Sequence, residues 1–124
     1  MEIRLLSLLE GARRAAGTVV IIDVYRAFTT AAVALQRGAA RLLLVDTPEA
    51  AFKLRCEDRG DLCLGEVSGI KVPGFDFGNS PLELSQAGVY GKTLIQSTSA
   101  GTKGVVAAVR AETLFAAALI LSLI

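Results

Sequence analysis

The chain has 124 residues, a length that fits one domain with a sizeable core. Thirteen Lys and Arg residues stand against twelve Asp and Glu residues, so the net charge is +1, which argues against binding nucleic acid through bulk charge. The chain has no histidine, which excludes a Ser-His-Asp triad, a His–Cys pair and phosphohistidine chemistry. An enzyme of this composition must work with carboxylates, Arg, Lys, hydroxyl groups and a metal ion.

The predicted elements alternate between strands and helices. Thr18–Ile22 is an apolar, β-branched run of the length of a strand buried on both faces. Pro81 follows Ser80 in a capping box that begins a short helix ending near Gly88. The other predicted elements are a strand at Met1–Leu6, a helix at Ser7–Ala16, a helix at Ala27–Arg37, a strand at Arg41–Val45, a helix capped by Thr47 and running to Arg59, a strand at Leu62–Leu64, a long irregular loop at Val67–Asn79, a strand at Thr93–Ser97, a helix at Thr102–Arg110 and a strand at Thr113–Ala117.

This order is typical of an α/β domain, here residues 1–124, with a mostly parallel sheet flanked by helices in a three-layer α/β/α arrangement. Right-handed crossovers bring the carboxyl ends of all parallel strands to one edge of the sheet, where α/β folds bind ligands. Asp23–Arg26, Glu66 and Ser97–Lys103 all follow predicted strands, and the loop with Asp76 lies above the same edge. We therefore expect the functional site there.

Three carboxylates are candidates for a metal site at this edge. Asp23, Glu66 and Asp76 are hard oxygen ligands, which suit Mg²⁺ in a chain without histidine. The alternative is that the three are unrelated: a helix cap, an exposed loop acid and the residue of an Asx-turn.

A second candidate feature binds anions. The turn Ser97–Gly104 leads from a strand into a helix, and its backbone amides, its hydroxyl groups and Lys103 would suit a phosphate. An ordinary capped connection is the alternative. Arg26 follows Asp23 at a distance where its guanidinium could hold a phosphate bidentately or pair with a carboxylate. The hydroxyl groups of Thr29 and Thr30 could donate to an anion or satisfy the backbone.

The remaining features concern location. Cys56 and Cys63 do not make a zinc site, and we interpret them as reduced thiols of a cytoplasmic protein. Met1–Arg4 is charged, so the start of the chain does not resemble a signal peptide. The apolar stretch Leu114–Ile124 is too short to span a membrane and is expected to be a buried strand or helix.

Four segments together resemble the 2-phosphosulfolactate phosphatase family, over roughly Val19 to Ala117. They are Asp23-Val24-Tyr25-Arg26-Ala27-Phe28-Thr29-Thr30, Gly65-Glu66 with Gly69, Gly74-Phe75-Asp76-Phe77-Gly78-Asn79-Ser80-Pro81 and Thr98-Ser99-Ala100-Gly101-Thr102-Lys103. The third segment is the most specific.

The resemblance implies a Mg²⁺-dependent phosphatase that hydrolyses the phosphate ester of 2-phosphosulfolactate, a small phosphorylated and sulfonated metabolite, on the route to coenzyme M. It implies that Asp23, Glu66 and Asp76 are metal ligands or the general base, with Arg26 also catalytic. Whether water attacks phosphorus directly or Asp23 forms an aspartyl-phosphate stays open. The phosphate-binding candidates are Arg26, Thr29, Thr30, Asn79, Thr98, Ser99, Gly101, Thr102 and Lys103.

Family members are about twice as long, so the resemblance also implies that this chain corresponds to the first half of a longer phosphatase. A second hypothesis follows from that length. An inactive module could bind an anionic metabolite without turning it over, and its apolar tail Ala118–Ile124 could pair with a second copy of the chain.

Overall fold

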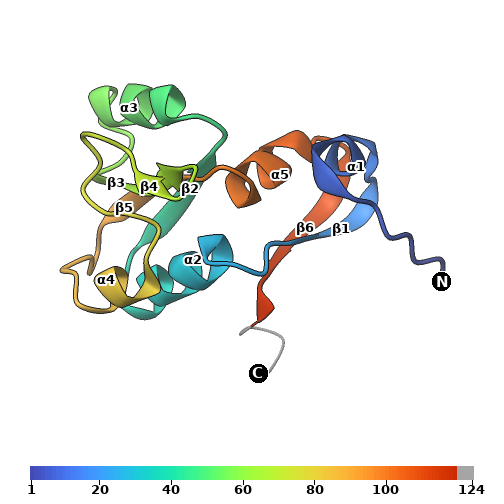
Figure 1. Ribbon diagram of the computed structural model, residues 1–124, viewed down its shortest axis with the longest axis horizontal. Helices are drawn as coiled ribbons and strands as arrows, with labels where there is room; N and C mark the ends of the chain where they lie inside the picture. Colours follow the sequence, from blue (N-terminus) through green and yellow to red (C-terminus); the bar gives the residue numbers. More distant parts are fainter. Residues whose placement is uncertain (120–124) are drawn as a thin grey trace.

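The computed structural model describes residues 1–119, and its helices and strands follow the predicted alternation (Figure 1). The predicted α/β class, with parallel strands flanked by helices, is confirmed. In chain order the elements are α1 (Leu8–Arg14), β1 (Gly17–Ile22), α2 (Ala27–Gln36), β2 (Arg41–Val45), α3 (Pro48–Cys56), β3 (Leu62–Val67), β4 (Ile70–Lys71), α4 (Pro81–Ser85), β5 (Thr93–Ser97), α5 (Gly101–Ala107) and β6 (Ala111–Ala117).

The strands form two sheets, which the order of the elements along the chain did not indicate. One sheet has four strands in the order β2-β5-β3-β4, with β2, β5 and β3 parallel to one another. The other, which we call the ribbon, consists of β1 and β6 in parallel register, with Thr18 opposite Thr113 and Ile22 opposite Ala117. Figure 1 shows the ribbon to one side of the four-stranded sheet, with α5 and α2 between them.

Two predictions about the elements were wrong. Met1–Leu6 is not a strand; it has no regular structure, and Leu5 is 91% exposed, because no neighbouring strand pairs with it. The predicted loop after Glu66 begins as a tight hairpin, because β3 continues to Val67 and pairs antiparallel with β4. Ser68 and Gly69 connect the two strands with positive φ angles of 51° and 82°, as the favoured two-residue hairpin turn requires.

Both predicted helix caps are confirmed. The Thr47 hydroxyl accepts a hydrogen bond from the Ala50 backbone N–H at 3.1 Å, and the Ser80 hydroxyl accepts one from Glu83 N–H at 3.2 Å. Helix α3 is three residues shorter than predicted and ends at Cys56. Helix α5 begins at Gly101 and ends at Ala107, so it is also shorter than predicted.

The core lies on both faces of the four-stranded sheet. Leu94 and Ile95 of the central strand β5 are fully buried; Leu94 packs against residues of α2 and α4, and Ile95 packs against α3 and the loop that holds Phe75. A smaller cluster of Ala27, Phe28 and Ala118 connects the ribbon to the rest of the molecule.

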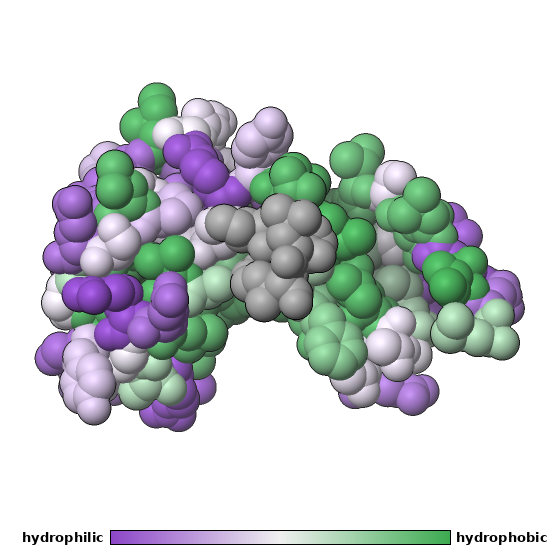
Figure 2. Space-filling model, turned by 90° about the horizontal axis from the view of Figure 1, so that it is seen from below, coloured by the Kyte–Doolittle hydropathy of each residue, from purple (hydrophilic) through white to green (hydrophobic). Residues whose placement is uncertain are grey.

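The predictions that Thr18–Ile22 is buried on both faces and that the stretch from Leu114 is buried were wrong, because β1 and β6 form a separate two-stranded ribbon that residues 1–119 leave partly exposed. Val20 is 50% exposed, Ile22 64% and Phe115 55%. Figure 2 shows hydrophobic residues at the surface on the side of the molecule that holds the ribbon. Within residues 1–119, no helix is both long and apolar enough to cross a membrane. The predicted tail Ala118–Ile124 lies outside the described residues beyond Leu119.

Candidate active site

The site is built around Asp23, the residue that follows β1. Its backbone N–H donates to the Ala117 carbonyl oxygen at 3.0 Å, which fixes it to the end of β6. Its carboxylate accepts hydrogen bonds from the backbone N–H groups of Tyr25 and Gly101. A Cβ atom at position 101 would lie 2.7 Å from the carboxylate oxygen Oδ2, so only glycine allows this close approach. Asp23 is therefore held by both the ribbon and the start of α5.

The second carboxylate, Glu66, comes from β3 of the other sheet. Its Oε1 accepts from the Ser99 backbone N–H at 2.8 Å. Its Oε2 accepts from the Gly69 N–H at 2.7 Å and from the Ser99 hydroxyl at 2.9 Å. Glu66 is only 8% exposed. Because both oxygens already accept hydrogen bonds, Glu66 ties the β3–β4 hairpin to the turn that leads into α5.

The surroundings shift the pKa values of these two carboxyl groups in opposite directions. Burial raises the pKa of Asp23, and the negative charge of Glu66 raises it further, against the opposing effect of the Tyr25 and Gly101 hydrogen bonds. Burial, the largest single effect on Glu66, also acts upward, but the hydrogen bonds from Ser99 and Gly69 and the charge of Arg26 together leave the pKa of Glu66 lowered. The environment thus favours the charged form of Glu66 and disfavours the charged form of Asp23.

Arg26 follows Asp23 in the chain, its charge acts on Glu66, and it has an unusual backbone. Its φ and ψ are 78° and −43°, and the Ala27 N–H donates to the Tyr25 carbonyl oxygen at 3.2 Å. These values describe a γ-turn of the rare, strained kind, which costs about 1–3 kcal/mol and persists where the surrounding structure enforces it. The side chain is exposed, and its charge acts on Glu66. The strained turn thus holds Arg26 where its charge acts on Glu66.

The first turn of α2 adds two hydrogen-bond donors that sequence reasoning missed. Thr30 N–H bonds the Arg26 carbonyl, but the backbone N–H groups of Phe28 and Thr29 have no partner in the described part of the chain. α2 has ten residues, so its free N–H groups and its dipole favour an anion at this end. The signal was present in the sequence, because this helix begins directly after the predicted strand and Asp23.

The turn that the sequence favoured for phosphate is instead occupied by its own hydrogen bonds. Thr98 N–H donates to the Thr102 hydroxyl at 2.8 Å, and Thr102 N–H donates to the Thr98 hydroxyl at 3.1 Å. Ser99 N–H serves Glu66, and Gly101 N–H serves Asp23. Thr98 and Thr102 are also buried. These four amides support the site and are not free to bind a phosphate.

Lys103 is also directed elsewhere. It lines a cavity of about 310 Å³ with residues of α1, of α5 and of the segment that follows β2, namely Leu9, Arg13, Asp46, Thr47, Val106 and Ala107. The predicted phosphate contact from Lys103 is therefore not supported by this geometry.

Three further candidates do not join Asp23 and Glu66. The Asp76 carboxylate accepts from Arg55 Nη1 at 3.1 Å and from the Cys63 backbone N–H at 2.8 Å, so it closes the loop over the face of the sheet that α3 covers. Thr30 is fully buried. Asn79 is 7% exposed, and its Oδ1 accepts from Gln96 Nε2 at 3.4 Å. All three act inside the fold.

The predicted set of three metal-binding carboxylates is consequently not assembled. Across residues 1–119, no group of three acidic or cysteine side chains is placed to hold a metal ion. Asp23 and Glu66 nevertheless fit Mg²⁺, which binds through one or two carboxylates and keeps several of its waters. The raised pKa of Asp23 beside the charged Glu66 is a second sign that a cation would be favourable there.

Comparison with known proteins identifies related sequences. The sequence profile described as 2-phosphosulpholactate phosphatase matches residues 5–121. A probable 2-phosphosulfolactate phosphatase of Carboxydothermus hydrogenoformans is 49% identical over 102 residues, which are 82% of this chain and 42% of the relative. The protein of the same name from Deinococcus radiodurans is 48% identical over 82 residues, 66% of this chain and 34% of the relative. That from Thermotoga petrophila is 44% identical over 100 residues, 81% and 43% of the two chains. The chain thus spans less than half the length of these relatives.

Proposed function

This chain belongs to the 2-phosphosulpholactate phosphatase family, and from that premise we propose that Asp23, Arg26 and Glu66 are the part of a phosphatase active site that it contributes. The substrate is the phosphate ester of 2-phosphosulfolactate or of a similar small acidic metabolite. Water cleaves the bond between phosphorus and the ester oxygen and yields the alcohol and inorganic phosphate. Support comes from the meeting of these residues from separate elements at the carboxyl ends of β1 and β3.

Arg26 and the first turn of α2 bind the phosphoryl group. The exposed guanidinium group offers a fork of donors that matches phosphate oxygens, and the free N–H groups of Phe28 and Thr29 add backbone donors at the positive end of the helix. Positive charge fixed at this position stabilises the charge that the phosphoryl oxygens carry during transfer. The strained turn at Arg26 keeps these donors in place before the substrate arrives.

Asp23 carries out the proton chemistry or the attack. Its carboxylate either takes the proton from an attacking water molecule or attacks phosphorus itself, and the proposal leaves these two routes open. The raised pKa makes it a stronger base than an ordinary aspartate. Glu66 is a positioning residue, because it holds Ser99 and the hairpin turn while it stays charged.

Asp23 and Glu66 are the residues that would hold Mg²⁺. Bound there, the ion would supply positive charge to the phosphoryl oxygens and lower the pKa of a bound water molecule. Asp76 is left out of this site, because within residues 1–119 it does not form a metal-binding group with Asp23 and Glu66, and its Oδ2 accepts from Arg55 and Cys63 instead.

One experiment tests the proposal. Phosphate release from 2-phosphosulfolactate and from a generic phosphate monoester is measured with the purified chain, with Mg²⁺ and with a chelator. We expect Arg26→Gln to lower turnover by at least about 100-fold, the effect of losing a charged hydrogen-bond donor in a transition state. Arg110→Gln is the matched control, because Arg110 is exposed and makes no ion pair or side-chain hydrogen bond in the described part of the chain.

The outcomes separate three cases. Release by the wild-type chain and by Arg110→Gln but not by Arg26→Gln supports the proposal. Equal release by both variants contradicts the role of Arg26. No release by the wild-type chain, with substrate still raising its melting temperature, supports the alternative of a metabolite-binding module.

A further inference from the structure

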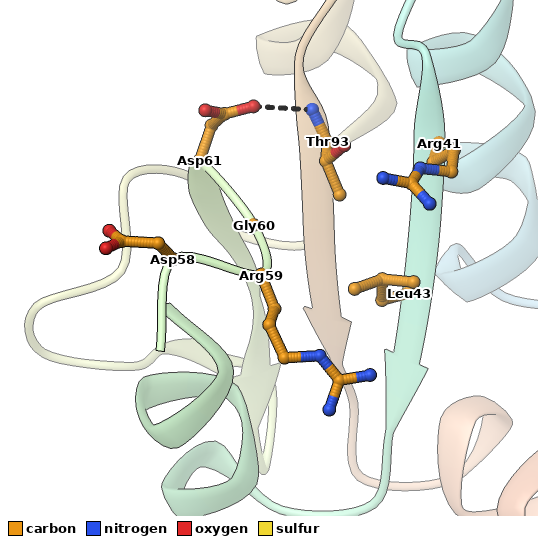
Figure 3. Close-up of a pocket in the computed structure, with 7 residues that line it drawn as sticks. All are labelled: Arg41, Leu43, Asp58, Arg59, Gly60, Asp61 and Thr93. Carbon is orange, nitrogen blue, oxygen red and sulfur yellow. Dashed lines mark hydrogen bonds between the residues drawn. The ribbon is translucent and has the colours of Figure 1, made fainter. Parts of the chain in front are cut away.

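A second site lies at the opposite end of the four-stranded sheet. A cavity of about 450 Å³ opens at the amino-terminal ends of its strands (Figure 3) and is lined by Arg41, Leu43, Asp58, Arg59, Gly60, Asp61 and Thr93. Arg41 and Thr93 are opposite each other as the first residues of β2 and β5, and Val45 and Ser97 as the last. Four residues of strand separate the two ends by about 13 Å, so this cavity is distinct from the candidate active site.

Two unpaired guanidinium groups face this cavity. Figure 3 shows the side chains of Arg41 and Arg59 extending into the same space on either side of Leu43. Within residues 1–119, neither guanidinium group makes an ion pair or a hydrogen bond. Both side chains are exposed and neither is committed to a carboxylate, so both are available to an anion that enters the cavity.

The acidic residues of the lining do not neutralise the two arginines. The Asp61 carboxylate accepts a hydrogen bond from the Thr93 backbone N–H at 2.7 Å. The Asp58 side chain points away from both guanidinium groups in Figure 3. Neither aspartate of the lining therefore forms an ion pair with the two guanidinium groups.

The backbone holds both arginines in place. After the end of α3, Asp58 takes a left-handed conformation with a φ of 55°, its N–H donates to the Arg55 carbonyl, and Arg59 N–H donates to the Leu54 carbonyl at 2.9 Å. This pair of bonds is a Schellman motif, which fixes the first residues after a helix. Arg41 is fixed by its place in β2, beside Thr93. The two forks are thus presented by a regular strand and a defined helix end.

We propose that this cavity binds a small oxyanion with two negative charges, through bidentate contacts from Arg41 and Arg59. Planar guanidinium groups match the oxygens of phosphate and carboxylate groups. The volume falls within the range of small-molecule sites. The bound anion would join β2 to the loop after α3 and would stabilise the four-stranded sheet independently of catalysis.

The test uses inorganic phosphate and malonate as probes with the full chain. Backbone amide NMR shifts and the melting temperature are followed during each titration, at constant ionic strength set with sodium chloride. We expect saturable shifts at Gly60, Asp61 and Thr93 and a rise in melting temperature. Arg41→Gln and Arg59→Gln should each weaken this binding by about ten- to 100-fold, which corresponds to one lost charged hydrogen-bonding group.

Two matched variants keep this site apart from the candidate active site. Arg26→Gln should remove any phosphate effect near Asp23 and leave the shifts at Thr93 unchanged, and Arg110→Gln should alter neither. Saturation by either probe supports the proposal, and the stronger probe shows whether a tetrahedral or a dicarboxylate anion is preferred. The proposal is overturned if both probes leave Thr93 unmoved, or if Arg41→Gln and Arg59→Gln bind as the wild-type chain does.

Discussion

Strand β5 of the four-stranded sheet and strand β1 of the ribbon differ in composition and in surroundings. Both are short and parallel to their neighbours, but β1 is the more apolar strand and β5 is the more buried one. In β5, four of five residues are buried, whereas in β1 only Val19 is. Glu66 belongs to the well-buried sheet, Ser99 lies in the turn after β5, and Asp23 follows the first strand of the ribbon. The candidate active site therefore lies between two unlike parts. The four-stranded sheet is well buried, whereas residues 1–119 cover the ribbon on only one side.

The largest expected effect comes from making the same Ile→Ala substitution once in the four-stranded sheet and once in the ribbon. Ile95→Ala in β5 should lower the free energy of unfolding by about 2–5 kcal/mol, because it leaves a cavity in a filled core. Ile22→Ala in β1 should change it by no more than about 0.5 kcal/mol, because that side chain is 64% exposed. Urea unfolding measures both. Equal losses would show that the ribbon is buried as deeply as the sheet in solution.

The next prediction concerns the contact between the ribbon and α5. Gly101→Ala places a Cβ atom 2.7 Å from both the Asp23 carboxylate and the Ala27 Cβ, so the variant should lose about 1–3 kcal/mol through overpacking and should move Asp23. Phosphate release should fall with it. Gly88→Ala is the matched control, because a Cβ there meets nothing within 4 Å. Normal turnover by Gly101→Ala would show that the position of Asp23 does not matter for the reaction.

Glu66→Gln tests the rigid side of the site. The lowered pKa of Glu66 means that its ionised form stabilises the fold above the pKa of the unfolded chain, and that this stability is lost as the pH falls through the folded pKa. We expect the variant to be about 1–2 kcal/mol less stable at neutral pH, through weaker bonds to Ser99 and Gly69. The difference should shrink in acid. A pH-independent difference would contradict this explanation.

Asp23→Asn should have the smallest effect on stability and the opposite sign. Because the pKa of Asp23 is raised, its ionised form costs stability, and this cost appears as the pH rises through the folded pKa. The variant should gain less than about 1 kcal/mol at neutral pH, since water screens this partly exposed group, and nothing in acid. Unfolding curves at several pH values, with phosphate release alongside, measure this. A variant less stable than the wild-type chain at neutral pH would show that hydrogen bonds to Asp23 outweigh its charge.

The fold was largely predictable from local patterns. β2 and β5 begin and end at the predicted residues, and the caps at Thr47 and Ser80 are confirmed. Local chemistry sets such features, since a run of apolar β-branched residues or a Ser-Pro pair acts within a few positions. The hairpin turn at Ser68 and Gly69 carried a local signal that was not used.

The site was predictable only in part. The approach of Asp23 and Glu66 was expected from a shared sheet edge, but they follow strands of two different sheets, and the turn leading into α5 connects them, because Ser99 bonds Glu66 and Gly101 bonds Asp23. The sequence does not show which polar residues already have hydrogen-bond partners inside the fold. Asp76, Thr98 and Thr102 are polar residues of the expected kind, yet each is engaged by a partner inside the fold.

The sequence by itself determined the alternation of strands and helices, the family and the residues that end β1, β2, β5 and β6, because these depend on composition and spacing along the chain. The tertiary structure decided the rest. It separated the strands into two sheets, engaged the amides of the Thr98–Lys103 turn and freed those of Phe28 and Thr29. It also placed Arg41 and Arg59 in one cavity. These outcomes depend on which groups, distant in the sequence, form hydrogen bonds with each polar atom in the folded chain. The spacing of residues along the chain does not contain that information.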